Sequence, residues 1–114
     1  MDLDWNNSFK EVINKMEEVG NLYSEAKGQS WQLQELRGTF LSRIISKQGN
    51  IAVSKAEIIA KGSEEYEKYI IGTAEAMKKE LKLKSQYESL KARFEAYRSL
   101  ISKEKKTMGL IGDN

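Results

Sequence analysis

The sequence predicts an all-helical protein, and three observations support this prediction. The chain of 114 residues contains no proline, the residue that most effectively interrupts a helix. Its composition is rich in residues that favour helix, among them Glu, Lys, Leu, Ala and Ile. Apolar residues also recur at alternating steps of four and three, as in a long bundle helix or a coiled coil. We therefore expect two long helices, at about 5–48 and 64–106, joined by a short helix.

The first long helix has an apolar row along one side, which we call its seam. Ten of its twelve positions are apolar or aromatic: Trp5, Phe9, Val12, Met16, Val19, Tyr23, Ala26, Ser30, Leu33, Arg37, Phe40 and Ile44. Trp31, Leu36, Leu41 and Ile45 lie beside the seam, so this half of the helix is expected to be covered on two sides. Trp31 has two readings, ordinary core against another helix or an anchor for a partner. We treat Trp31, Leu41 and Ile45 as a candidate partner interface.

Stop and start signals then define the connection. Gly49-Asn50 supplies the left-handed residue that commonly ends a helix. A short helix is predicted at 51–61, ended by Gly62. Ser63 is a suitable N-cap for the next helix, and three glutamates in the first turn favour the positive end of the helix dipole.

The last helix contains two apolar rows that differ in register. One row holds Tyr66, Ile70, Ala74, Met77 and Leu81, and the other holds Leu83, Tyr87, Leu90, Phe94, Tyr97 and Ile101. A displacement of two residues between the rows would rotate the buried face, so the two halves would contact different neighbours. Gly72, with small residues after it, makes a narrow face that another helix could approach. We include Gly72 and Tyr97 in the candidate partner interface.

Helices of this length predict an elongated hairpin rather than a rounded molecule. A helix of about 40 residues is roughly 60 Å long. Two such helices leave apolar surface uncovered, and self-association is the simplest way to cover it. We expect one helical domain at 1–106, a homo-oligomer, and a flexible tail at 107–114.

Composition argues against catalysis. The chain contains no histidine and no cysteine, which excludes histidine-based triads, thiolate nucleophiles and the commonest metal ligands. The carboxylates lie off the seams in charged surroundings, so no catalytic, cofactor or metal site is expected. The beginning of the chain is acidic and polar, unlike a secretory signal, and no apolar run approaches the roughly 18 residues that span a bilayer. We expect a cytoplasmic protein, in the host cytoplasm if the chain is phage-encoded.

One charge pattern stands out. The chain has a net charge of +2, but residues 78–106 hold ten basic and four acidic side chains. Four of the basic ones, Lys84, Lys91, Arg98 and Lys105, recur every seven residues beside the second apolar row; we call them the basic row. They could form a surface salt-bridge ladder with the nearby glutamates. They could instead follow a nucleic-acid backbone, with Lys82 and Arg93 as further contacts. A membrane surface is not expected as a partner, because the apolar face of this amphipathic helix is needed for packing.

A family resemblance covers residues from about 30 to 103. The segments are Ala60-Lys61-Gly62-Ser63-Glu64-Glu65-Tyr66, Gly72, Glu75-Ala76 and Arg93-Phe94-Glu95-Ala96-Tyr97-Arg98-Ser99. This pattern resembles a family of small helical phage and prophage proteins of no established activity. Tyr97 stands where that family usually has tryptophan. Because members tend to be encoded near phage recombination and replication genes, the resemblance implies a context and no mechanism.

The predicted function is binding without catalysis. The first hypothesis is an accessory of phage DNA recombination or replication that contacts single-stranded DNA or a recombinase through the basic row. The alternatives are an adaptor or inhibitor that binds a host protein through Trp31 and its neighbours, and a purely structural coiled coil. Tyr87, Phe94 and Tyr97 could stack on bases, but their seam positions favour a core role.

Overall fold

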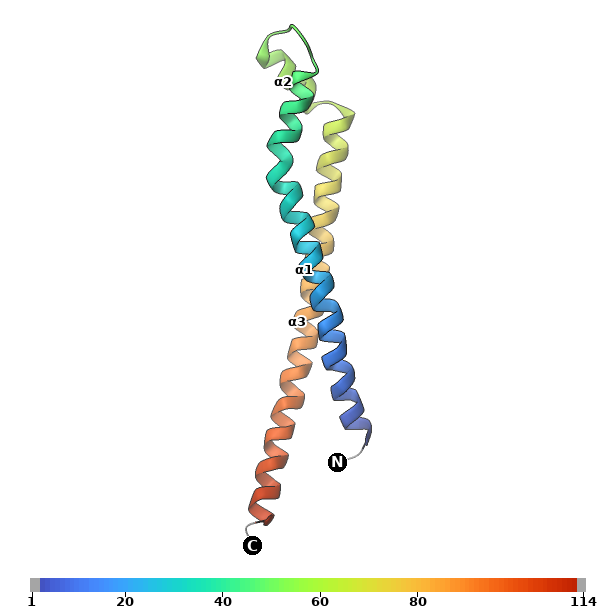
Figure 1. The fold of residues 1–114 in the computed structure, drawn as a ribbon, viewed down its shortest axis with the longest axis vertical. Helices are drawn as coiled ribbons and strands as arrows, with labels where there is room; N and C mark the ends of the chain where they lie inside the picture. The colour runs from blue at the N-terminus through green and yellow to red at the C-terminus, as the bar shows by residue number, and fades with distance from the viewer. Residues whose placement is uncertain (1–2, 113–114) are drawn as a thin grey trace. The chain divides into compact units, whose positions relative to one another are not determined.

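The computed structural model describes residues 3–112 and the side chains of residues 6–107. It contains helix α1 (Leu3–Ser46), helix α2 (Val53–Lys61) and helix α3 (Glu64–Gly112), as Figure 1 shows. No strand occurs between residues 3 and 112. The all-helical class and the order long, short, long are therefore confirmed. The homo-oligomer stays a prediction.

The contacts within the chain fall into two compact units. One unit, here the terminal unit, contains the first part of α1 up to Tyr23 and the part of α3 from Leu83 onward. The other, here the connector unit, contains residues Ser24–Lys82 and therefore the end of α1, all of α2 and the beginning of α3. Each unit is described by itself below.

The turns between the helices follow from the stop signals. Gly49 has a φ of 78°, a left-handed conformation that glycine adopts at little cost. Gly62 closes α2, because its backbone N–H donates to the Ile58 carbonyl at 3.1 Å. The hydroxyl of Ser63 accepts the Tyr66 N–H at 3.2 Å, which satisfies one of the free donors at the start of α3. The predicted cap at Ser63 is confirmed.

In the connector unit, α1 and α3 run antiparallel and α2 packs on them. Its hydrophobic cluster consists of the buried residues Ile44, Ala60 and Tyr66, with Phe40, Leu41, Ile45 and Ile70 packed against it. Polar contacts reinforce the helix pair. The Tyr69 hydroxyl donates to the Leu33 carbonyl at 2.5 Å, and Arg37 Nε donates to the Tyr66 hydroxyl at 3.0 Å. These contacts define which turns of the two helices lie side by side.

In the terminal unit, aromatic side chains join the antiparallel helices. Phe9 stacks on Phe94 with ring centroids 5.6 Å apart, and Tyr23 lies 6.4 Å from Tyr87. Val12, Val19 and Leu90 are buried in the same seam. The seam predicted for α1 is therefore confirmed wherever its side chains are described, except at Arg37, which is exposed. Trp5 lies outside the described side chains.

The predicted change of register in α3 is wrong. The covered side of the helix continues without a break through Tyr66, Tyr69, Thr73, Ala76, Glu80, Leu83, Tyr87, Leu90, Phe94, Tyr97 and Ile101, all of them buried or half-buried. These residues follow steps of three and four along the whole length. Ala74, Met77 and Leu81, which the sequence assigned to a seam, are exposed. Thr73 and Ala76 have small side chains, and these occupy the covered side of α3 in place of Ala74 and Met77.

The long helices also differ in length from the prediction. α1 ends two residues before the predicted 48, and α2 begins at Val53 rather than 51. α3 continues to Gly112 instead of ending near 106, so most of the predicted flexible tail at 107–114 is helical. Residues 107–112 contain no proline, and a single internal glycine costs a helix only about 1 kcal/mol. Residues 113–114 lie outside the described chain.

Candidate binding surfaces

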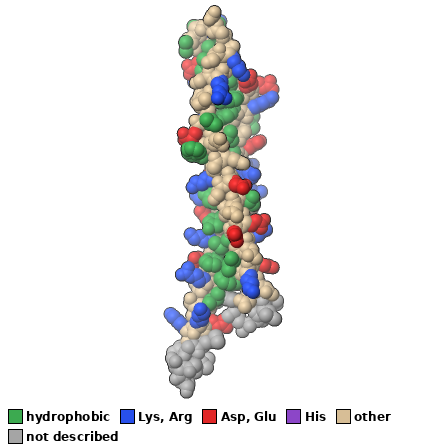
Figure 2. Space-filling model, viewed as in Figure 1, with side chains coloured by type: hydrophobic (Ala, Val, Ile, Leu, Met, Phe, Trp, Pro, Cys, Tyr) green, Lys and Arg blue, Asp and Glu red, His purple; other side chains and the backbone are tan. Residues whose placement is uncertain are grey.

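The basic row lies on the exposed surface of α3 in the terminal unit. Lys84, Lys91, Arg98 and Lys105 are all exposed. Steps of seven residues correspond to two helical turns, so the four cations stand on one side of the helix, about 10.5 Å apart along it. On the face drawn in Figure 2, hydrophobic side chains gather where the helices meet and basic side chains project at the margins. The structure therefore brings the four predicted cations into one line.

Few acidic side chains neutralise this line. Glu95 approaches Arg98 at 3.8 Å, a long and exposed ion pair. Lys84, Lys91 and Lys105 make no ion pair with any side chain among residues 6–107. Of the four cations in the predicted salt-bridge ladder, only Arg98 therefore forms an ion pair with a described side chain.

Lys82 and Arg93 do not extend the basic row. Each lies two residues from a member of the row, and side chains at i and i+2 do not face each other on a helix. Lys82 belongs to the connector unit. Arg93 projects on the other side of the α3 seam, where it lines a hollow with residues of α1. That Lys82 and Arg93 are further contacts for nucleic acid stays a prediction, and the two do not share the side of the helix on which the basic row lies.

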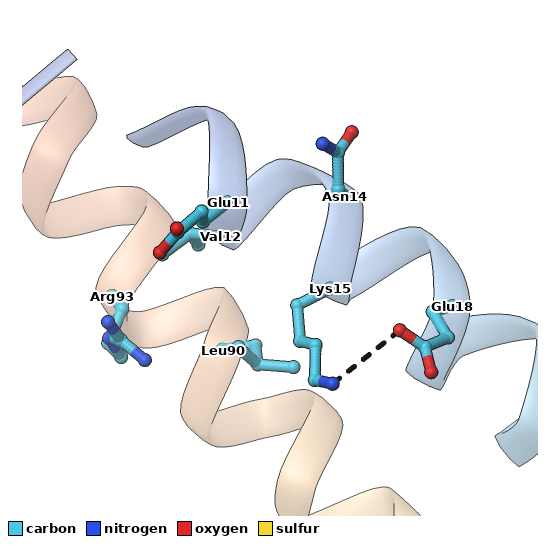
Figure 3. Close-up of a pocket in the computed structure, with 7 residues that line it drawn as sticks. All are labelled: Glu11, Val12, Asn14, Lys15, Glu18, Leu90 and Arg93. Carbon is cyan, nitrogen blue, oxygen red and sulfur yellow. Dashed lines mark ion pairs between the residues drawn. The ribbon is translucent and has the colours of Figure 1, made fainter. Parts of the chain in front are cut away.

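The hollow beside Arg93 is shallow and of mixed charge. It has a volume of about 440 Å³ and is lined by Glu11, Val12, Asn14, Lys15, Glu18, Leu90 and Arg93. In Figure 3 Lys15 turns toward Glu18, 3.6 Å away, and Asn14 points out of the hollow. Opposite charges alternate along its rim, so the hollow favours neither an anion nor a cation.

The aromatic residues near the basic row are occupied within the unit. Tyr87, Phe94 and Tyr97 are half-buried. Tyr97 and Phe94 each lie 5.6 Å from Phe9, and Tyr87 lies against Tyr23 and Gly20. Their rings fill the space between α1 and α3, which confirms the core interpretation. Tyr97, predicted as a partner contact, is used inside the helix pair.

The predicted partner interface around Trp31 divides into a packed part and a free part. Leu41 and Ile45 are half-buried against the cluster of Ile44, Ala60 and Tyr66. Trp31 is 64% exposed. Gly72 is half-buried, but a methyl group in place of its hydrogen would meet nothing within 4 Å, so no helix of this chain uses the narrow face there.

The structure adds residues to this surface that the sequence assigned elsewhere. Met77 and Leu81 are 42% and 60% exposed on α3. Arg37, a polar interruption of the α1 seam, lies 5.9 Å from the centroid of the Tyr66 ring and bonds to its hydroxyl. With Lys61, Tyr66, Glu67, Ile70 and Ile71 it lines a second hollow, of about 530 Å³. Arg37 is a polar residue within an apolar row, and this irregularity is the sequence signal that could have revealed the second hollow.

One ion pair on α2 is close enough to change proton affinities. Lys61 Nζ donates to the Glu57 carboxylate at 2.8 Å. This hydrogen bond, together with the attraction between the charges, lowers the pKa of Glu57 and raises the pKa of Lys61 from their ordinary values. Both side chains are about half exposed, so the pair supports α2 locally and contributes little to stability.

The described residues include no group of three or more His, Cys, Asp or Glu side chains close enough to hold a metal ion. No described helix is both long enough and apolar enough to span a membrane. Comparison with family models, curated proteins and solved structures found no match to this chain. The resemblance to phage proteins therefore stays a prediction, and any functional argument depends on the surfaces above.

Proposed function

We propose that this chain is a non-catalytic helical binding protein whose basic row contacts the phosphate backbone of single-stranded nucleic acid. The observation that carries the proposal is the line of four exposed cations, three of which have no acidic partner among the described side chains. A flexible single strand can follow such a line, because it needs only a sequence of cations at its phosphates.

The arrangement predicts binding through charge rather than through bases. Tyr87, Phe94 and Tyr97 are packed between the helices, which leaves no aromatic platform along the row among the side chains that the structure describes. Affinity should then depend little on base sequence and steeply on salt. For a single strand the logarithm of the affinity falls with that of the salt concentration with a slope of about −0.7 for each phosphate contacted. Four contacts give a slope of about −3.

The resemblance to phage proteins gives this proposal a biological context. A protein of that context that binds single strands would act as an accessory in DNA recombination or replication. A recombinase that presents an acidic surface is the other ligand that the same row could contact.

A labelled oligothymidine tests the proposal by fluorescence anisotropy. We expect binding at low salt and, with a slope of about −2.8 for four contacts, an affinity about 50-fold weaker after a fourfold rise in salt. The double variant Lys91→Glu/Arg98→Glu should bind far more weakly, because it reverses the middle of the row. Both residues are exposed, so helix content by circular dichroism should not change.

The matched control is Lys47→Glu/Lys55→Glu. It makes the same change in net charge on exposed residues of the connector unit and should keep most of the affinity. Absence of binding at low ionic strength contradicts the proposal. Equal losses of affinity in the two double variants would show that binding depends on net charge alone, and this result would also contradict the proposal.

A further inference from the structure

The connector unit exposes apolar side chains on one side of its helix pair. Trp31 on α1 and Met77 and Leu81 on α3 are 64%, 42% and 60% exposed. Together with Ile70 and Ala74 they form what we call the Trp31 flank. A tryptophan can bury about 150–250 Å², so a ring that is 64% exposed leaves a large apolar area open on this unit.

Packing contacts show that the two rows of this flank lie on the same side. On α1, steps of three and four residues lead from Trp31 through Gln34 and Gly38 to Leu41, so these residues share one side of the helix. On α3, the same steps lead from Ile70 to Leu81. Leu41 and Ile70 pack against the same hydrophobic cluster. Both rows therefore start at this cluster and run away from it along one side of the helix pair.

The same side also contains a hollow. Arg37, Tyr66, Ile70 and Ile71 line it, and its volume of about 530 Å³ exceeds that of an indole ring. Arg37 contributes a guanidinium group with no ion pair among the described side chains. A cation near an aromatic face is attracted to it, so this hollow suits an indole as well as an aliphatic side chain.

We infer that a second copy of this chain covers the Trp31 flank, in an antiparallel two-fold dimer. Trp31 precedes Arg37 by six residues, or about 9 Å along α1. A two-fold axis across α1 near Gln34, midway between them, brings Trp31 of each copy to the hollow of the other. The projecting ring and the hollow that receives it are thus both present on one surface, as a self-complementary interface requires.

Sedimentation equilibrium over a range of concentrations tests the inference on the full chain. The mass should rise from 13.0 kDa toward twice that value as the concentration increases. Trp31→Ala should raise the dissociation constant about tenfold or more, as truncation of a central tryptophan commonly does. Leu36→Ala, at a position that is 47% exposed on the opposite side of α1, should leave the dissociation constant nearly unchanged. Both positions are exposed, so both variants should keep their helix content.

A chain that stays monomeric at all concentrations, or an undiminished dimer of Trp31→Ala, would overturn the inference and leave the flank for a different protein.

Discussion

At the scale of single residues, the polar groups between α1 and α3 have partners. Thr73, 8% exposed, donates its hydroxyl to the Tyr69 carbonyl at 2.9 Å, and the fully buried Ser30 accepts from Gln34 at 3.0 Å. No buried side-chain nitrogen or oxygen within residues 6–107 lacks a hydrogen-bond partner. Buried polar atoms cost free energy unless they are paired, so these bonds select which polar residues the seam tolerates.

The Tyr69 hydroxyl provides a test of this point. Tyr69→Phe removes its bond to the Leu33 carbonyl while keeping the ring stacked on Phe40. We expect the free energy of unfolding to fall by about 0.5–1.5 kcal/mol, the usual net value of such a bond. Tyr23→Phe is the control, because the Tyr23 hydroxyl makes no hydrogen bond to a described residue. Urea denaturation should show little change for the control, and equal losses in both variants would refute the assignment.

At the scale of elements, α3 shows how a helix chooses its buried side. Two apolar rows compete in its sequence, and the structure buries the one that passes through Thr73, Ala76 and Glu80. Met77 and Leu81 are more apolar than these residues but remain exposed. Within each unit the covered residues of α3 follow steps of three and four, and in the connector unit Met77 and Leu81 fall beside that row.

Truncation of two leucines distinguishes the two registers. Leu90→Ala should lower the free energy of unfolding by about 2–5 kcal/mol, because Leu90 is 9% exposed in the seam and its loss leaves a cavity. Leu81→Ala should change it by only about 0.5 kcal/mol, as expected for a surface site. Chemical denaturation in dilute solution measures both without a contribution from self-association. If Leu81→Ala lowered the free energy of unfolding as much as Leu90→Ala, the register predicted from the sequence would be supported instead.

At the scale of the whole molecule, the described core is small. Eight apolar residues of the described chain are buried, three of them in the terminal unit and five in the connector unit. Two of the eight are valines and three are alanines. Small cores give marginal stability, and association is a general way to increase it.

Thermal unfolding connects this stability to the proposed dimer. Because a partner that binds only the folded chain stabilises it by mass action, the Tm should rise with protein concentration. A concentration 100 times the dissociation constant corresponds to about 2.7 kcal/mol, enough for a shift of several degrees in a chain of this size. Trp31→Ala should make the Tm independent of concentration. A constant Tm for the natural chain would count against a folded dimer.

Several features were determined by the sequence alone. The absence of proline and the period of the α1 seam determined the helical class, and Gly49, Gly62 and Ser63 determined where helices end and begin. The seven-residue spacing of the basic row was also correct, because a helix converts spacing directly into a side. These are local properties, which depend on each residue and its near neighbours.

Only the tertiary structure decided which of several possible sides is covered. It buried Thr73 and Ala76 in place of Ala74 and Met77, packed Leu41 and Ile45 while leaving Trp31 exposed, and separated Arg93 from the basic row. The sequence lists every apolar side that a helix offers. The choice among them depends on the shape and position of the helix that packs against it, and no local pattern contains that information.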